Sequence, residues 1–277
     1  STVWDLRRRL RRLRFDITID PQSLTKSAAI ARLSGAPRRI GLDGEMGREL
    51  SRWLNNDLVH TSAPHIVDRS LELLKTLHAD TDQARFDLPK YPEAEQSMSR
   101  FLLQNDLSQP FALLNVGAGW PSKLWPAERF GGIARHLHQN HRLPSVIIWA
   151  GGAEREAAEE AMKVAGNAAV LAPDTSLREL AELARRATVF FGCDTGPMHI
   201  AAAVGTPCVA LYGPTLPAEC GPYGAQHIAV QAFHQKSNGN RERRRADNVA
   251  MRAIDVPMAA RACDDILAQN VDVRHIA

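Results

Sequence analysis

Hydrophobic and polar positions alternate in regular blocks along the second half of the chain. Short, continuous apolar runs occur at residues 111–116, 145–149, 187–191 and 208–212. Longer stretches with apolar residues on one helical side separate these runs. Strands that are apolar throughout are typical of a parallel sheet buried on both faces. The pattern therefore predicts an α/β fold in which helices cover a parallel sheet.

The individual elements expected in this half follow in chain order. The expected strands are at 111–116, 145–149, 168–171, 187–191, 208–212 and 228–231. The expected helices are at 93–106, 126–140, 154–165 and 176–187, followed by one that ends at 205 and one at 256–267. Residues 235–247 are polar, basic and unpatterned, which predicts a flexible loop.

The first half is less regular. It predicts strands at 15–20 and 38–42 and helices at 23–33 and 65–77, and a loop with a helical piece at 45–55. Residues 80–92 are polar with two prolines and are typical of an interdomain linker.

Residues 4–14 predict an amphipathic helix, because Leu6, Leu10 and Leu13 fall on one helical side and arginines cover the rest. The simpler interpretation is a surface helix packed on a sheet. The alternative is a contact with anionic lipid headgroups or nucleic acid. A stripe of three leucines is narrow, which favours the first interpretation, although the arginines are also suited to an anionic surface.

Composition limits the class of protein. The chain of 277 residues is 44% hydrophobic and 23% charged, and its formal charge is +3. This composition is globular, with enough length for two domains. No run of eighteen apolar residues is present and no signal peptide is visible, which predicts a cytoplasmic protein. The four cysteines form no C-x-x-C pair and are expected to be reduced thiols in or near the core.

Polar and small residues collect directly after the predicted strands of the second half. The set comprises Gly117, Ala118, Gly119 and Lys123 after the first strand, Gly151, Gly152 and Glu154 after the second, Asp194, Thr195, Gly196 and His199 after the fourth, and Tyr212, Gly213, Pro214 and Thr215 after the fifth. Ligands of doubly wound sheets bind beyond the carboxyl ends of the strands, so these residues are expected on one ligand-binding rim.

The rim favours a phosphate-containing ligand. Glycines allow phosphate to approach the backbone, Lys123 supplies a positive charge for a diphosphate, and Glu154 is placed like a carboxylate that accepts ribose hydroxyls. Asp194, Thr195 and His199 are candidates for the sugar hydroxyls or the distal phosphate.

Each of these residues also has a simpler interpretation. Lys123 and Glu154 could be solvated charges, Asp194 could only cap the following helix, and His199 could be a partly buried histidine with ordinary partners. The prediction rests on the whole set and not on any one member.

No metal site is expected. The sequence contains no D-x-D, H-E-x-x-H or Walker A motif. His136, His138 and His141 are close in sequence, but His136 and His138 point to different sides of the expected helix, which makes a shared metal improbable.

At these residues the sequence resembles glycosyltransferase family 9, the ADP-heptose:lipopolysaccharide heptosyltransferases of the GT-B fold. The strongest match is FFGCDTGPMHIAAAVGTPCVALYGPT at 190–215. SKLWPAERF at 122–130, WAGGAE at 149–154 and FDITIDPQSLTKSAAIARLSG at 15–35 add to it, and the last is closest to the heptosyltransferase I branch.

The resemblance implies two Rossmann-like domains with parallel sheets: an acceptor-side domain at 1–92 whose first strands are missing, and a nucleotide-sugar-binding domain at 93–255. A C-terminal helix and tail at 256–277 would pack back toward the first domain. It implies inverting, metal-independent transfer of heptose from ADP-heptose to the Kdo-containing inner core of lipopolysaccharide. ADP-heptose is then a substrate, no cofactor is expected, and nucleic acid is not a partner. The protein would be cytoplasmic, with a possible peripheral contact on the cytoplasmic face of the inner membrane.

The implied donor contacts are Ala118, Gly119, Lys123, Glu154, Asp194, Thr195, Gly196 and His199. Ala118 and Gly119 align with hydroxyl-bearing residues in some members, so only their backbone can contribute here. The family's aspartate general base lies on an N-terminal strand and turn that this chain, starting at Ser1, does not contain. Asp20 is the nearest carboxylate but occupies a different position in the family pattern, so no catalytic residue is assigned. The alternatives are a GT-B enzyme for another nucleotide-sugar and a non-catalytic protein that binds a nucleotide-sugar or an anionic polymer.

Overall fold

The computed structural model describes residues 2–44, 47, 50–79, 83–107, 110–237 and 239–274, without the side chains of residues 240 and 270–274. The chain divides into two compact units, Ser1–Arg85 and Phe86–Ala277. The boundary falls inside the polar segment 80–92 that the sequence indicated as a linker, a few residues before the expected end of the first domain at 92.

Unit 1 contains a three-stranded parallel sheet in the order β1-β2-β3. Its elements are α1 (Val3–Arg12), β1 (Ile17–Asp20), α2 (Thr25–Ser34), β2 (Arg38–Leu42), α3 (Ser51–Leu54), β3 (Asp57–Val59) and α4 (Ile66–Glu72), which continues as a 3-10 turn. The residue pattern does not predict β3, because three residues are too few to show a period. Part of the expected loop 45–55 lies outside the described residues.

Helix α1 begins with a capping box between Thr2 and Asp5, and it buries none of its residues. It lies along α2, where the Arg11 side chain lies next to Gly35. The expected surface position of this helix is confirmed, but its main neighbour is α2 and not the sheet. Trp4 and Leu13 are exposed.

Unit 2 contains a six-stranded sheet in the order β6-β5-β4-β7-β8-β9, and every neighbouring pair is parallel. The strands are β4 (Ala112–Asn115), β5 (Ser145–Ile148), β6 (Ala169–Leu171), β7 (Val189–Cys193), β8 (Cys208–Tyr212) and β9 (Ile228–Gln231). The helices are α5 (Pro92–Gln104), α6 (Ala127–His141), α7 (Gly151–Ala165), α8 (Leu177–Arg186), α9 (Gly196–Ala203), α10 (Pro217–Cys220), α11 (Asn240–Arg245), α12 (Val249–Ala253) and α13 (Val256–Arg274). This order is that of a doubly wound, Rossmann-type sheet, whose strand order reverses between β4 and β7.

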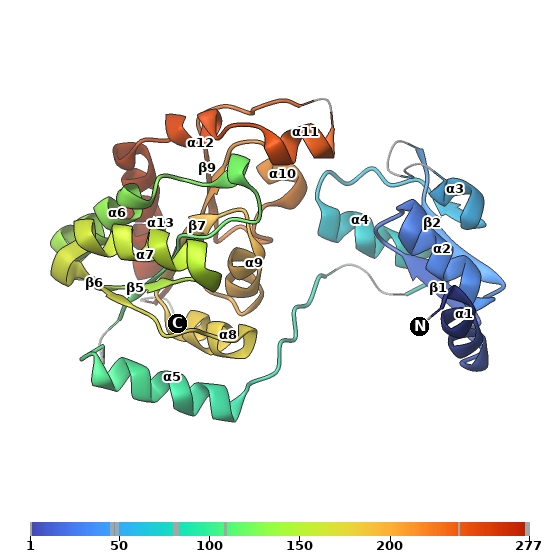
Figure 1. Ribbon diagram of the computed structural model, residues 1–277, viewed down its shortest axis with the longest axis horizontal. Coiled ribbons are helices and arrows are strands. Elements are labelled where there is room, and N and C mark those ends of the chain that lie inside the picture. The colour runs from blue at the N-terminus through green and yellow to red at the C-terminus, as the bar shows by residue number, and fades with distance from the viewer. Residues whose placement is uncertain are drawn as a thin grey trace. The chain divides into compact units, whose positions relative to one another are not determined.

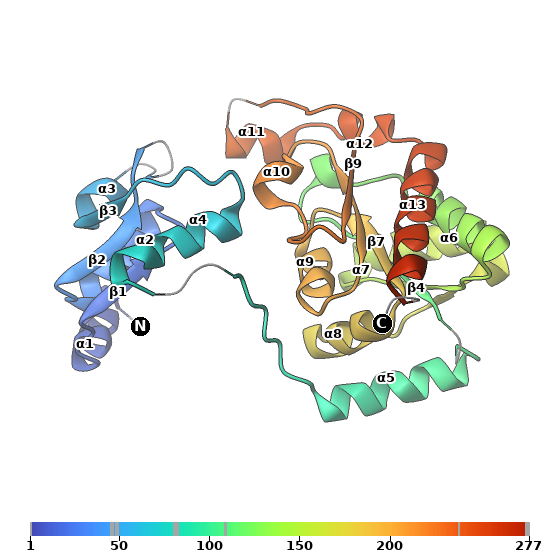
Figure 2. The ribbon, with the colours of Figure 1, turned by 180° about the vertical axis from the view of Figure 1, so that it is seen from behind.

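Two hydrophobic layers cover the sheet of unit 2. One joins α6, α7 and α13 to one face through residues such as Phe130, Leu137 and Ile266, and the other joins α5, α8 and α9 to the opposite face. Figure 1 shows these two groups of helices on either side of the strands, and Figure 2 shows α13 beside α6. The continuous apolar strands predicted from the sequence are explained by this double cover, since β4, β5, β7 and β8 are buried at every position.

The basic segment 235–247 is not simply a loop. Within its described residues it forms α11, which packs beside the 3-10 turn Pro121–Lys123. Ser122 Oγ donates to the Arg243 carbonyl oxygen at 2.6 Å, and the Arg244 guanidinium lies 5.1 Å from the centre of the Trp120 ring. The residue pattern does not predict this helix, because it has no apolar stripe. Polar contacts with a turn that is distant in sequence stabilise it. The predicted closing helix is present as α13.

The close approach of α6 and α7 depends on Gly131. A Cβ atom at this position would overlap the Ala161 carbonyl oxygen and lie 2.6 Å from Val164 Cβ. At the neighbouring Gly132, the nearest atoms would be Val256 methyl groups at 3.4 Å, which is ordinary contact. The two glycines therefore sit in different environments on the same helix.

We expect Gly131→Ala to destabilise the protein by about 1–3 kcal/mol, because the added methyl group overpacks a rigid helix contact. Gly132→Ala is the matched control. It should be neutral or stabilising by up to about 1 kcal/mol, because alanine favours helix over glycine. Urea unfolding followed by circular dichroism measures both, and equal effects of the two substitutions would contradict the packing argument.

Candidate functional site

The strand order reverses between β4 and β7, and the polar residues singled out in the sequence follow these two strands directly. Asn115 at the end of β4 pairs in register with Gly192 of β7. The buried Asn115 amide donates to the Gly117 carbonyl oxygen at 3.1 Å and to Thr195 Oγ1 at 3.2 Å. This amide joins the two turns across the switch point. Asn115 is not among the predicted site residues, although a polar residue that ends an apolar strand is a signal for one.

A pocket of about 290 Å³ opens at this point. It is lined by Asn115, Gly117, Ala118, Gly119, Ile148, Trp149, Ala150, Glu154, Thr175, Leu177, Leu180, Thr195, Gly196 and Pro197. Five of the predicted donor contacts are in this set: Ala118, Gly119, Glu154, Thr195 and Gly196. The sequence did not indicate the apolar wall formed by Trp149, Leu177 and Leu180. Trp149 directly follows β5, and the two leucines lie in the first turn of α8.

A polar cluster is formed by Lys123, Asp194 and His199, which are close in sequence to residues that line the pocket. Lys123 Nζ donates to Asp194 Oδ2 at 2.6 Å, and both side chains are nearly buried, with exposed fractions of 11% and 6%. His199 Nε2 lies 3.5 Å from Asp194 Oδ1 and keeps 46% of its side chain exposed. The interpretation of Lys123 as a solvated charge is therefore wrong.

Asp194 has further partners. Thr215 Oγ1 donates to its Oδ2 at 2.8 Å, and Cys220 Sγ lies 3.6 Å from the same oxygen. Burial raises the pKa of Asp194, but the hydrogen bond from His199, the charge of Lys123 and the hydrogen bonds from Lys123 and Thr215 outweigh it and lower the pKa to about 2. The N-cap of α9 is Thr195, so Asp194 is not simply a helix cap. Its carboxylate faces protein partners and fixes the position of Lys123.

The N-terminus of α9 offers backbone donors beside this cluster. The Thr195 side chain makes no capping hydrogen bond, and Pro197 lies in the first turn. A Cβ atom at Gly196 would meet no atom within 4 Å. An uncapped helix N-terminus with open space in front of it is suited to an anionic group.

Glu154 lies in the first turn of α7 and also lines the pocket. Its Oε2 accepts a hydrogen bond from the Ala150 amide at 2.9 Å. Burial raises the pKa of Glu154, and the Ala150 hydrogen bond lowers it by less, so the net shift is upward. A side chain at Gly117 would collide with the Glu154 carboxylate, which explains the glycine at that position. Glu154 is therefore a partly desolvated acceptor at a pocket wall and not an ordinary surface charge.

The ammonium group of Lys123 also contacts an aromatic ring. Its Nζ lies 4.2 Å from the centre of the Trp120 ring, and Arg244 of α11 lies near the same ring. The basic segment of the sequence is thereby brought to the Lys123 end of the site. Asp20, the carboxylate considered in the first half, is 4% exposed and accepts hydrogen bonds from Ser23 N and Asn55 Nδ2, so it organises a turn in unit 1.

A crevice at the switch point of a doubly wound sheet, lined by residues of an uncapped helix N-terminus and by a carboxylate, is where doubly wound α/β proteins bind their ligands. A sequence model of "Glycosyltransferase family 9 (heptosyltransferase)" matches residues 3–250. The chain therefore belongs to glycosyltransferase family 9.

Individual relatives agree with this assignment. The chain is 31% identical to lipopolysaccharide heptosyltransferase 1 of Pseudomonas aeruginosa over 80% of this chain and 61% of that protein. It is 29% identical to the Salmonella typhimurium protein of the same name over 78% of this chain and 66% of that protein. The chain thus spans somewhat less than two thirds of the length of these relatives.

Solved structures confirm the fold. The family 9 glycosyltransferase of Veillonella parvula superposes with a TM-score of 0.76 at 22% identity, covering 96% of this chain and 79% of that one. The Escherichia coli heptosyltransferase WaaC with ADP superposes with a TM-score of 0.70 at 23% identity, covering 95% of this chain and 77% of that one. The predicted α/β fold of GT-B type, with parallel sheets in two Rossmann-like parts, is confirmed.

Asp194→Asn tests the polar cluster. The pKa of Asp194 is lower in the folded than in the unfolded chain, so its charge stabilises the fold above about pH 4, and this stabilisation is lost as the pH falls toward 2. We expect a loss of about 2 kcal/mol in the free energy of unfolding at pH 7. The difference from the native chain should shrink between pH 4 and pH 2.

Urea unfolding at a series of pH values measures this difference. Asp174→Asn, at an exposed carboxylate of the same unit, is the control and should have little effect at any pH. A loss for Asp194→Asn that stays constant down to pH 2 would show that the Asp194 charge does not stabilise the fold in the way described.

Proposed function

We propose that this chain binds ADP-heptose at the β4–β7 switch point and transfers heptose to the Kdo-containing inner core of lipopolysaccharide. The observation that carries the proposal is the pairing of Lys123 with Asp194 beside the uncapped N-terminus of α9, whose first residues line the same pocket as Glu154. Membership of family 9 and the ADP in the WaaC structure support the same ligand class.

The orientation of the donor follows from charge. The diphosphate would lie against the N-terminus of α9 and the Lys123 ammonium, with backbone contacts from Ala118 and Gly119. The ribose would reach Glu154, whose carboxylate accepts hydroxyl protons. The adenine would lie against the apolar wall of Trp149, Leu177 and Leu180. Thr195 and His199 would face the heptose.

The proposed reaction is an inverting displacement. The acceptor hydroxyl oxygen bonds to the anomeric carbon, the bond from that carbon to the diphosphate oxygen breaks, and ADP leaves. Negative charge grows on the departing diphosphate, and Lys123 and the α9 dipole stabilise it because they are fixed before the reaction. The proton of the hydroxyl passes to a base outside the residues assigned here. No step uses a metal ion or cofactor.

We propose that the protein works in the cytoplasm, at the membrane surface where a lipid-linked acceptor is found. Trp4 and Leu13 of α1 are exposed among arginines, and this combination favours contact with anionic headgroups over contact with nucleic acid. No described helix is long and apolar enough to cross a membrane.

Glu154→Gln tests the ribose contact. Glutamine keeps the acceptor for the Ala150 amide and removes a charge that burial disfavours, so the empty protein should be as stable as the native one or more stable. ADP affinity should fall about tenfold, because hydrogen bonds to a charged acceptor are the stronger ones.

Isothermal titration with ADP and thermal unfolding of the empty protein measure the two effects. Glu156→Gln, two residues along the same helix at an exposed position, is the matched control and should change neither quantity. Unchanged ADP affinity in Glu154→Gln would remove Glu154 from the proposed site.

The proposed activity itself is tested in two steps. ADP and ADP-heptose binding are measured by calorimetry, and heptose transfer to a Kdo-lipid acceptor is then assayed with and without EDTA. We expect binding, transfer and an initial rate that EDTA leaves unchanged, with ADP affinity in EDTA as the check that the protein stays folded. Binding without transfer would make the chain a nucleotide-sugar-binding protein, and a rate lost in EDTA and restored by a divalent ion would contradict metal-independent transfer.

A further inference from the structure

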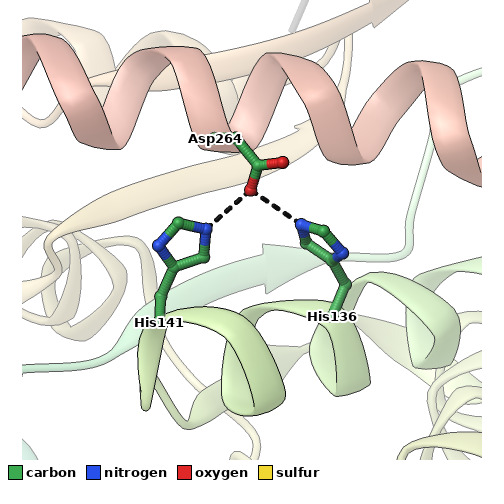
Figure 3. Close-up of side chains that lie close together, drawn as sticks. All are labelled: His136, His141 and Asp264. Carbon is green, nitrogen blue, oxygen red and sulfur yellow. Dashed lines mark hydrogen bonds and ion pairs between the residues drawn. The ribbon is translucent and has the colours of Figure 1, made fainter.

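A second cluster of polar side chains lies between α6 and α13, away from the pocket. Asp264 Oδ1 lies 2.7 Å from His136 Nε2 and 2.6 Å from His141 Nε2. Figure 3 shows both imidazoles of α6 turned toward the same carboxylate oxygen of α13. The side chains are 23%, 29% and 42% exposed for His136, His141 and Asp264, so the cluster is accessible from solvent.

The end of α6 makes this convergence possible. His136 and His141 are five residues apart, which would separate their directions on a regular helix. His141 is the last residue of α6, and Arg142 turns the chain with a left-handed φ of 52°. The His141 ring is therefore free to swing toward α13. His138 lies outside the cluster, so the proposal below departs from the expectation of no metal site at His136 and His141.

We propose that His136, His141 and Asp264 bind a divalent transition-metal ion of the zinc class, with water as the fourth ligand. One ligand atom from each residue lies within 4.8 Å of the others. A tetrahedral zinc site with bonds of about 2.0–2.1 Å holds its ligand atoms on the order of 3.4 Å apart. Small side-chain rotations connect the two arrangements. Two imidazoles and one carboxylate suit zinc and not magnesium or calcium, which prefer oxygen ligands.

The proposed ion is structural. Helix α6 begins after the carboxyl end of β4 and runs back along the sheet, so its C-terminal residues lie toward the edge opposite the switch point. The ion would cross-link α6 to the long C-terminal helix α13 and would take no part in heptose transfer. The proposal is therefore independent of the proposed function and compatible with transfer that survives EDTA.

The test uses the chain without a polyhistidine tag, freed of metal by a chelating resin. Zn²⁺ is titrated against a chromophoric chelator, and thermal unfolding is followed with and without Zn²⁺. We expect one ion per chain and a rise of the unfolding temperature in Zn²⁺, because an ion that binds only the folded state stabilises it. Asp264→Asn, an isosteric change, should weaken Zn²⁺ affinity at least tenfold and abolish the rise.

Asp265→Asn at the exposed neighbouring position of α13 is the first control, and His138→Gln on α6 is the second. Both should retain native Zn²⁺ affinity, whereas His136→Gln should lose it. Co²⁺ substitution distinguishes this site from the cysteines, since a nitrogen and oxygen site lacks the thiolate charge-transfer band. Far-ultraviolet circular dichroism confirms that each variant is folded. Equal Zn²⁺ affinity in Asp264→Asn and the native chain, a thiolate band, or no ion bound would overturn the proposal.

Discussion

The ion pair between Lys123 and Asp194 is the interaction on which the rest of the site depends. It joins the segment after β4 to the turn after β7, the two strands between which the sheet order reverses. Both groups are nearly buried, so each is costly without the other. The additional hydrogen bond from Thr215 and the nearby His199 reduce this cost. A cation is thereby held in place next to an anion-attracting helix end before any ligand arrives.

The wall of the pocket at Glu154 carries a carboxylate instead of a cation. Glu154 is partly desolvated, and its single backbone hydrogen bond does not fully compensate for the burial. Such a group gains from a ligand that donates hydroxyl protons. The proposed donor, with a diphosphate at one end and a ribose hydroxyl pair toward the other, matches this order of cation and carboxylate. In the proposed complex, the ribose hydroxyls would compensate for the burial of this charge.

Basic residues of the chain are concentrated in two helices, α11 and α1. Those of α11 pack on the turn that carries Lys123, where Arg244 and Lys123 lie near the same Trp120 ring, and they raise the positive potential at the proposed diphosphate end. Those of α1 remain on the surface of unit 1 with exposed Trp4 and Leu13. The net charge is only +3, but positive charge is concentrated in α1 and in α11, and the two helices have different proposed targets.

The sequence by itself determined the α/β class, the six strands of the second unit and five of the residues that line the pocket. Buried parallel strands are continuous apolar runs, and the residues that end them are polar because they meet the crevice. The tertiary structure alone decided what these residues contact. It turned Asp194 toward Lys123, placed Asn115 between two turns, folded 240–245 into α11, and brought Asp264 to His136 and His141. These outcomes depend on contacts between residues from about 70 to 128 positions apart, which no local period can encode.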